Sequence, residues 1–413
     1  MWVASSRGPA TFFTENDMNQ HHIRDGIHAT VERNRQRLLD LSDYLFDTPE
    51  LGNHEFKAHA AITAVLRENG FLVDDQVLGL DTAFRATCVF GAGGPRIGLL
   101  CEYDALKDMG HACGHQMQAP AILGAALALK EHLVGQNATL VIYGTPAEET
   151  TSAKLPMAKQ GIFDDLDVAI MMHAGDRTTV DGKSLALNLV DFIFHGKASH
   201  AAIAPEKGIS ALDAVLMMFN GVEYLREHVR QDVRMHGVIT DGGKVANIVP
   251  ERASAQFYIR ANDRPYLDQV VERVYNVARG AALATGATLE INEVKAYDNK
   301  LNVETLNALL LDEAAAAGAP MITPPRQFTG STDFSCVSYR VPGACLRVSF
   351  VPLDVPSHSQ VWLNEGKSES AHAAVITAAK AIACACYRLA ADAETFNAIR
   401  ERFAAAKAAP SRP

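Results

Sequence analysis

Six side chains that could bind a divalent metal ion or transfer a proton occur in short polar segments of this chain. They comprise one thiol, three imidazoles and two carboxylates: Cys113, His115, His173, His358, Glu148 and Glu149. Thiolate, imidazole and carboxylate are the ligands that zinc and related divalent ions take in proteins. Whether these residues form one site depends on whether the fold brings them together.

Each candidate also has a purely structural explanation. A cysteine such as Cys113 often packs as a small hydrophobic side chain, and Cys-x-His alone is a weak motif. The pair Glu148 and Glu149 could form a solvated face, His173 could be a hydrogen-bonded core histidine, and His358 could lie in a surface loop. Convergence of several such groups, rather than any one of them, is what would indicate a site.

Short apolar runs precede the candidate residues and are typical of buried parallel strands. We predict four such strands, over Arg96–Cys101, Thr139–Tyr143, Asp167–Met172 and Cys345–Val351. Helical patterns over Ala119–Leu133 and Ser152–Lys159 separate the first three, and further helices are expected over Ile27–Phe46 and Ala371–Leu389. This alternation predicts an α/β domain with a mostly parallel sheet.

The candidate residues follow these strands at one end, where open α/β sheets bind their ligands. Each strand brings one residue or one pair: Cys113 and His115 follow the first, Glu148 and Glu149 the second, His173 the third and His358 the last. Gly114 gives the backbone room to turn, so that the side chains on either side of it can face one ion. Glutamates directly after an apolar strand would be costly unless a cation neutralises them. The sequence therefore predicts a metal site at this edge of the sheet.

Five ligands are too many for one catalytic zinc ion, which keeps about three protein ligands and an open position. They suit two ions about 3.5–4 Å apart that share a ligand and a water, because such a pair activates water and polarises a carbonyl. That chemistry fits hydrolysis of an amide or another C–N bond. One of two adjacent glutamates can bind metal while the other serves as the general base. Asp104 could orient a ligand histidine, or it could equally cap a turn.

The middle of the chain has a different pattern, with strands and helices in the order βαββαβ. The predicted elements are Leu187–His195, Gly208–Val229, Met235–Thr240, Ser254–Ala261, Pro265–Ala284 and Thr288–Val294. This order matches a ferredoxin-like module. We therefore expect a catalytic domain made of residues 20–185 and 297–395, an inserted domain at 186–296, and tails at 1–19 and 396–413.

Composition and missing motifs exclude several function classes. Lys and Arg number 38 and Asp and Glu number 48, giving a net charge of −10, which argues against a nucleic-acid partner. We find no uninterrupted apolar stretch of roughly 18 residues for a membrane span and no secretory signal, and Met18 is an alternative start. Seven scattered cysteines are typical of a reduced, cytoplasmic protein. The glycine-rich run at 91–94 precedes its strand, which argues against a nucleotide-binding oxidoreductase.

Several segments together resemble the dinuclear-metal amidohydrolase and exopeptidase family, which includes carboxypeptidase G, hippurate hydrolase and auxin-conjugate hydrolases. The resemblance rests on Glu102-Tyr103-Asp104-Ala105-Leu106, His111-Ala112-Cys113-Gly114-His115, Gly144-Thr145-Pro146-Ala147-Glu148-Glu149, Gly196-Lys197-Ala198-Ser199-His200-Ala201-Ala202 and Val245-Ala246-Asn247-Ile248-Val249-Pro250. These segments occur in the family's order over most of the chain, and the Cys-Gly-His form is most similar to the aminobenzoyl-glutamate hydrolase branch.

The resemblance implies two divalent metal ions per chain, zinc or manganese, with cobalt as an alternative. Cys113 would bridge the ions, His115 and His173 would hold one of them, and Glu149 and His358 would hold the other. Each ion would then have three protein ligands and room for water.

The resemblance also implies roles outside the metal ligands. Glu148 would be the general base, and the inserted domain would be a lid that forms a homodimer. His200 would reach the partner's site and stabilise the oxyanion, while Asn247 and Arg260 would bind the substrate. From the residues alone, His200 could be an ordinary loop residue and Arg260 a solvent-facing arginine.

The implied function is hydrolysis of the amide bond of a small N-acyl or N-aroyl amino acid or a dipeptide-like conjugate, which carries a carboxylate. Hydrolytic deamination of an aromatic amine is one alternative. A metal-free binding protein or partner subunit is another, although such a relative would normally have lost Glu148 or a ligand. The chain departs from the family pattern at Gln116, Thr150-Thr151 and Ala174. These departures bear on the substrate and affect none of the proposed ligands.

Overall fold

A six-stranded sheet forms the centre of the larger domain, with the strand order β1-β2-β4-β3-β5-β10. The computed structural model describes residues 15–180, 182–325 and 330–408. The strands are β1 (Leu72–Asp75), β2 (Phe84–Phe90), β3 (Arg96–Cys101), β4 (Ala138–Gly144), β5 (Val168–Gly175) and β10 (Gly343–Ser349). The four strands from β4 to β10 run parallel, whereas β1 and β2 pair antiparallel at one edge. The predicted α/β fold with a mostly parallel sheet is confirmed.

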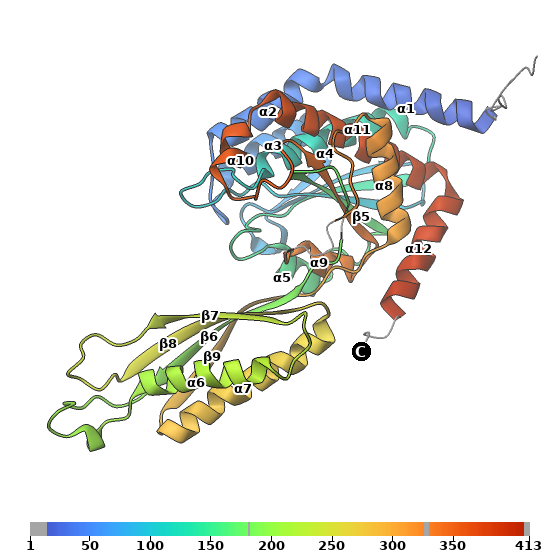
Figure 1. Cartoon of the computed structure of the whole chain (residues 1–413). Helices are drawn as coiled ribbons and strands as arrows, with labels where there is room; N and C mark the ends of the chain where they lie inside the picture. The colour runs from blue at the N-terminus through green and yellow to red at the C-terminus, as the bar shows by residue number, and fades with distance from the viewer. Residues whose placement is uncertain (1–14, 181, 326–329, 409–413) are drawn as a thin grey trace, which may run out of the picture.

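Helices cover both faces of this sheet (Figure 1). They are α1 (Glu15–Arg33), α2 (Arg35–Asp47), α3 (Phe56–Glu68), α4 (Gln118–His132), α5 (Lys154–Lys159), α8 (Glu304–Ala316), α9 (Phe334–Ser338), α10 (Gln360–Glu365), α11 (Glu369–Ala391) and α12 (Ala393–Ala408). The main core contains α4, α11 and the residues Val168, Ile170 and Met172 of β5. A smaller core beneath α5 and α9 contains the alternate residues Ala169 and Met171. Because side chains alternate along a strand, His173 lies on the face of the smaller core.

The helix α11 contains the most apolar long segment among the described residues. By length and composition it could cross a membrane, with a mean hydropathy of 1.4. However, 72% of its most apolar window is buried inside the protein, where the helix packs against α4 and α8. It is a core helix of this domain.

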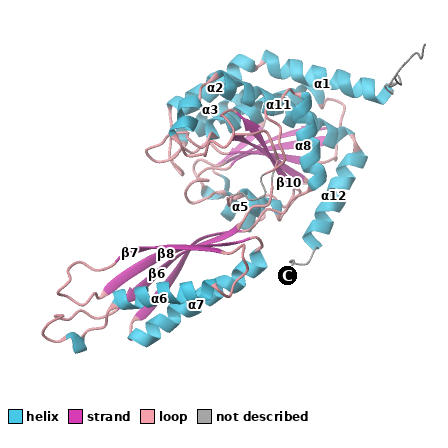
Figure 2. Ribbon diagram, viewed as in Figure 1, coloured by secondary structure: helices cyan, strands magenta, loops and turns pink. Residues whose placement is uncertain are grey.

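The inserted domain is a four-stranded antiparallel sheet with two helices on one face (Figures 1 and 2). Its elements are β6 (Ala186–His195), α6 (Ala211–Arg226), β7 (Arg234–Asp241), β8 (Arg252–Ala261), α7 (Arg264–Thr285) and β9 (Thr288–Tyr297). The strand order β7-β8-β6-β9 and the βαββαβ connectivity are those of a ferredoxin-like module. This module has a hydrophobic core of its own, and a small cluster joins Leu187 and Tyr297 to Leu155 of the larger domain.

The structure differs from the sequence-based expectations at both ends of the chain. The helix expected over Ile27–Phe46 is broken at Asn34, whose side chain bonds to the backbone carbonyl of Thr30 and so competes with the helical pattern. The first helix also begins earlier, at Glu15, within the expected N-terminal tail. Most of the expected C-terminal tail is helical, because α12 extends through it to Ala408 and buries Ile399. Its many alanines favour helix.

Gly144 ends β4 immediately before the segment that carries the adjacent glutamates, and it has no room for a side chain. An added Cβ would lie 2.1 Å from the Phe84 ring and 2.6 Å from the Tyr103 hydroxyl oxygen. We predict that Gly144→Ala lowers the free energy of unfolding by about 1–3 kcal/mol, because an overpacked core must shift. Urea denaturation followed by circular dichroism measures the change.

The matched control is Gly280→Ala in α7, where an added Cβ meets nothing within 4 Å. Because alanine favours helix over glycine by about 1 kcal/mol, this substitution should be neutral or stabilising. Equal effects of the two substitutions would contradict the packing argument for Gly144.

Candidate metal centre

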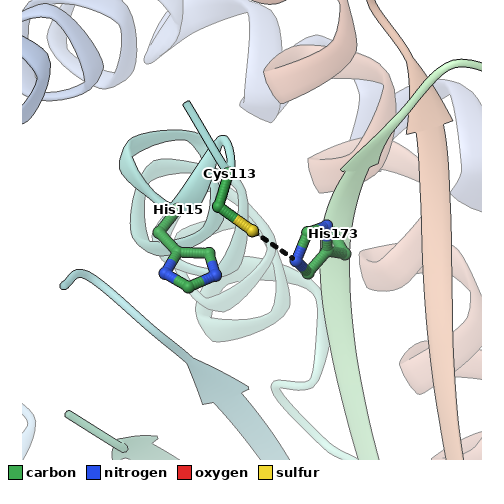
Figure 3. A group of neighbouring side chains, drawn as sticks. All are labelled: Cys113, His115 and His173. Carbon is green, nitrogen blue, oxygen red and sulfur yellow. Dashed lines mark hydrogen bonds between the residues drawn. The ribbon is translucent and has the colours of Figure 1, made fainter. Parts of the chain in front are cut away.

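Cys113 and His115 lie in the loop that follows β3, and His173 lies beside them on β5 (Figure 3). The Cys113 Sγ is 3.8 Å from the Nε2 atom of His173. Gly114 between the first two residues has φ of +80°, and a Cβ there would be 2.5 Å from the Cβ of Ala174. Only glycine therefore allows this loop to pack against β5 while both flanking side chains face the same point.

The hydrogen bonds of both histidines leave one nitrogen available in each ring. The Nδ1 of His115 donates to the backbone oxygen of Asp104 at 3.0 Å, and the Nδ1 of His173 donates to the backbone oxygen of Ala174 at 2.8 Å. With Nδ1 protonated in each ring, Nε2 carries the lone pair. This arrangement, in which the second nitrogen is fixed by a carbonyl or carboxylate, is usual for histidines that bind metal.

A second group forms around the same thiol. The Nε2 atom of His358 lies 3.3 Å from the Cys113 Sγ and 3.2 Å from Oε1 of Glu149. His358 has a positive φ of +59°, and its backbone N–H donates to the Ala112 carbonyl at 3.0 Å. A non-glycine residue in this conformation is strained, and the surrounding hydrogen bonds maintain it.

Asp104 connects the two groups. One carboxylate oxygen lies 3.2 Å from Nδ1 of His115, and the other accepts a hydrogen bond from the backbone N–H of Glu149 at 2.9 Å. Since Asp104 is fully buried, both contacts are protected from water. The carboxylate positions residues of both groups at once, in addition to any role in the local turn.

These donor atoms fit two divalent cations that share one ligand. The ligand atoms of Cys113, His115 and His173 lie within 4.8 Å of one another, and so do those of Cys113, Glu149 and His358. Nε2 of His115 and Oε1 of Glu149 are buried and have no hydrogen-bond partner, although each has a group of opposite charge nearby. Buried polar atoms without hydrogen bonds are rare, and a bound cation would satisfy both of them.

The electrostatics of Cys113, His173 and Glu149 agree with this interpretation, whereas at His115 the neighbouring Cys113 and Asp104 outweigh burial and raise the pKa of the imidazole. Burial raises the pKa of the Cys113 thiol to about 12, so the thiolate is stable only next to positive charge. Burial, followed by the nearby charge of Arg347, lowers the pKa of His173 to about 3, which keeps the imidazole neutral. Burial opposes ionisation of Glu149, but the His358 imidazole 3.2 Å away outweighs it and the pKa falls to about 2. Neutral imidazole and ionised carboxylate are the forms that bind metal.

Glu148 lies beside both groups and lines a cavity of about 410 Å³. Burial, together with the charges of Asp333, Glu102 and Glu149, raises its pKa well above the ordinary value. The backbone turns sharply before it, because Ala147 has φ of +62°. The buried Glu55 holds this turn by accepting a hydrogen bond from the Ala147 N–H at 2.8 Å.

The three candidate residues of the inserted domain lie elsewhere in this chain. His200 and Asn247 are exposed and occupy neighbouring loops, which are joined by a hydrogen bond from the Ala201 N–H to the Asn247 carbonyl at 3.0 Å. Arg260 is half-buried on β8, with its guanidinium 5.1 Å from the Tyr258 ring centre. None of the three is among the described residues that line the cavity.

Comparisons with known proteins place this arrangement in context. The sequence profile described as peptidase family M20/M25/M40 matches residues 98–381. The Xaa-Arg dipeptidase of Mus musculus is 33% identical over 369 residues, covering 86% of this chain and 85% of the relative. One subunit of the p-aminobenzoyl-glutamate hydrolase of Escherichia coli (strain K12) is 31% identical over 437 residues, covering 86% of this chain and 90% of the relative.

A solved structure shows a similar fold. It belongs to a dinuclear metal binding peptidase from the M20 family of Bacillus subtilis, and it superimposes with a TM-score of 0.66 at 19% identity. The match covers 87% of this chain and 99% of that chain. At this level of identity the likeness concerns the fold.

Sequence reasoning missed a buried network of charges directly beneath the site. The Nζ atom of Lys154 lies 2.6 Å from Oε1 of Glu102 and 2.9 Å from Oδ1 of Asp333, and all three side chains are fully buried. Against the cost of burial, Asp333 and Glu102 hold the pKa of Lys154 well above its ordinary value. The sequence did contain one signal for this network. Lys154 is a lysine among apolar residues in a short helix that follows Glu148 and Glu149.

We predict that Lys154→Met lowers the free energy of unfolding by about 3–5 kcal/mol, because it leaves buried carboxylates without their cation. Urea denaturation at neutral pH measures the loss. Lys159→Met, at an exposed position of the same helix, should change stability by no more than about 0.5 kcal/mol. If both variants unfold at the same urea concentration, the network does not have the stabilising role assigned to it.

Proposed function

The chain belongs to peptidase family M20/M25/M40 and is a metal-binding amidohydrolase, and on this basis we propose that it hydrolyses small N-acyl or N-aroyl amino acids or dipeptides. One observation carries the proposal: two groups of ligands share Cys113 next to a free carboxylate, Glu148, at a cavity. The two relatives are named for a dipeptide ending in arginine and for an aroyl glutamate. Both named compounds contain an amide bond next to an amino-acid carboxylate.

The proposed mechanism assigns a role to each residue of the site. Cys113 would be the shared ligand of two divalent ions, with His115 and His173 on one and Glu149 and His358 on the other. When bound, the two ions supply the activation of water and the polarisation of the scissile carbonyl. Glu148 accepts a proton from the attacking water and returns it to the leaving amine. Zinc or manganese is the proposed metal, and cobalt is the alternative.

We also propose that the protein is a homodimer formed through the inserted domain. β7 is an edge strand of that domain, and its residues Val238 and Ile239 are 60% and 43% exposed. Exposed edge strands pair readily with another chain, and closed two-fold dimers are the commonest result. His200 would then reach the cavity of the partner subunit, and Asn247 and Arg260 would contribute to substrate binding. A cytoplasmic location stays a prediction from the sequence.

The first test of this function concerns Glu148. Glu148→Gln should reduce kcat by about 10²–10⁴-fold, the usual contribution of a general base, while two metal ions per chain are retained. Glu149→Gln should instead release metal, because that residue is a ligand. Turnover of N-benzoylglycine, alanyl-arginine and p-aminobenzoyl-glutamate, combined with elemental analysis, measures both effects.

Three outcomes would contradict this assignment. Full activity with a single ion per chain would exclude the two-metal site. Loss of metal in Glu148→Gln but not in Glu149→Gln would mean that the two roles are reversed. Hydrolysis of anilines in place of the three amides would favour deamination over the proposed reaction.

The second test concerns the dimer. His200→Ala should reduce kcat by about 10²–10³-fold, the usual cost of one oxyanion donor, and should leave the metal content unchanged. Co-expressed Glu148→Gln and His200→Ala chains should recover activity in the heterodimer, since one of its two sites would contain both intact residues. If isolated heterodimers are as inactive as the parent proteins, His200 does not act across the interface.

A further inference from the structure

The segment 147–152 carries both glutamates of the site, and a non-glycine residue with a positive φ lies at each of its ends. Ala147 has φ of +62° and Ser152 has φ of +59°. This left-handed conformation is costly for residues other than glycine, and it persists only where the surrounding contacts enforce it. The contacts that hold the two ends of this turn therefore determine where the side chain of Glu148 lies.

Hydrogen bonds close the turn from inside and attach it to its surroundings. The Ala147 carbonyl accepts the N–H of Ser152 at 2.7 Å and that of Thr150 at 3.2 Å. The Ser152 hydroxyl donates to the buried carboxylate of Asp333. The N–H of Ala147 donates to a residue outside the turn, Oε1 of Glu55 at 2.8 Å. Each strained end is thus bound to a buried carboxylate.

Glu55 belongs to a rigid part of the larger domain. It is fully buried at the start of α3, and its second oxygen, Oε2, accepts the hydroxyl of Thr82 at 2.8 Å. The segment that leads to it packs directly on the turn, because a Cβ added to Gly52 would lie 2.9 Å from the Cα of Ala147. The carboxylate therefore has little freedom to follow a change in the turn.

The backbone on both sides of Glu148 is fixed in this way. Before it, the Ala147 N–H is held by Glu55, and after it, the Glu149 N–H is held by Asp104 at 2.9 Å. Asp104 acts on the residue that we propose as a metal ligand. Glu55 acts instead on the residue that precedes the proposed general base.

We propose that Glu55 is a positioning residue for Glu148, which fixes Ala147 in its left-handed conformation and so directs the carboxylate of the base toward the cavity. The inference rests on the proposed function, in which Glu148 transfers the proton. Glu55 is not among the described residues that line the cavity, so it acts through the backbone. Because a displacement of about 1 Å can reduce a rate about 100-fold, the effect falls on turnover more than on substrate affinity.

The test is a double-mutant cycle between Glu55 and Ala147, measured on whichever of the three amides the parent enzyme hydrolyses fastest. Glu55→Met fills a similar space but accepts no hydrogen bond from the turn. It should lower kcat by about 10- to 100-fold, change KM by less than about threefold and leave the metal content unchanged. Glu55→Gln should keep kcat within about threefold of the parent, because its amide oxygen still accepts the Ala147 N–H.

The second arm of the cycle relieves the strain. In the Glu55→Met protein, Ala147→Gly should recover about 5- to 10-fold of the lost kcat, because glycine adopts a positive φ without a steric cost. A contribution of Glu55 to folding alone predicts no such recovery.

Two further variants separate positioning from stability. Glu55→Ser places a favoured N-cap residue at the start of α3 but is too short to reach the turn, so it gives the same test if Glu55→Met folds poorly. Glu50→Ala is the matched control, since this carboxylate accepts the N–H groups of Lys57 and Ala58 in the same helix, at 2.8 Å and 3.0 Å. It should destabilise the protein and leave kcat within about twofold of the parent.

Hydrogen–deuterium exchange gives a readout that does not depend on turnover. Removal of the Glu55 carboxylate should speed exchange in the segment 147–152 and leave the central strands unchanged. If the parent enzyme hydrolyses none of the amides, the proposed function fails and exchange alone decides, because unchanged exchange excludes a role of Glu55 in holding the turn. With an active parent, the proposal is overturned if Glu55→Met and Glu55→Ser keep the parental kcat, if Glu50→Ala lowers kcat equally, or if Ala147→Gly recovers nothing.

Discussion

The burial of several acidic groups at one edge of a sheet is the constraint on which the rest of the structure depends. Glu102, Glu148 and Asp333 bring carboxylate oxygens within 4.8 Å of one another, and the buried thiol of Cys113 is nearby. Such a concentration of negative charge in a medium of low dielectric is stable only with cations. The fully buried Lys154 supplies one of these cations, and the ligand groups that line the cavity are suited to bind metal cations.

Much of the site could be predicted from the sequence because its residues follow apolar strands, and strand polarity fixes the edge to which they are delivered. Cys113, His115 and His173 lie together for this reason. Lys154 and Glu55 were missed, since their roles depend on which elements pack against them, and no local periodicity encodes that. The break between α1 and α2 was not predicted, because the polar residue at that point fits a continuous helical pattern. The alanine-rich segment that forms α12 was interpreted as a tail.

The two domains divide the tasks of the protein. The larger domain contains the ligand groups, Glu148 and the described cavity lining, whereas the inserted domain folds around a core of its own. Contacts between the two include a small apolar cluster, a hydrogen bond from Lys295 to the Thr150 carbonyl at 3.1 Å and one from the Arg264 N–H to the Asn299 side chain at 3.0 Å. The described groups that would carry out the chemistry thus all belong to the larger domain, and the inserted domain has a core independent of them.

The close approach of Gly114 to Ala174 has a consequence for the metal-binding groups. Neighbouring strands lie about 4.8 Å apart, and their hydrogen bonds prevent the sheet from stretching. Because Gly114 packs against Ala174 of β5, the loop that carries Cys113 and His115 has a fixed position relative to His173. Ligands on unsupported loops could adapt to ions of different sizes. Ligands held against one strand instead favour ions within a narrow range of radii.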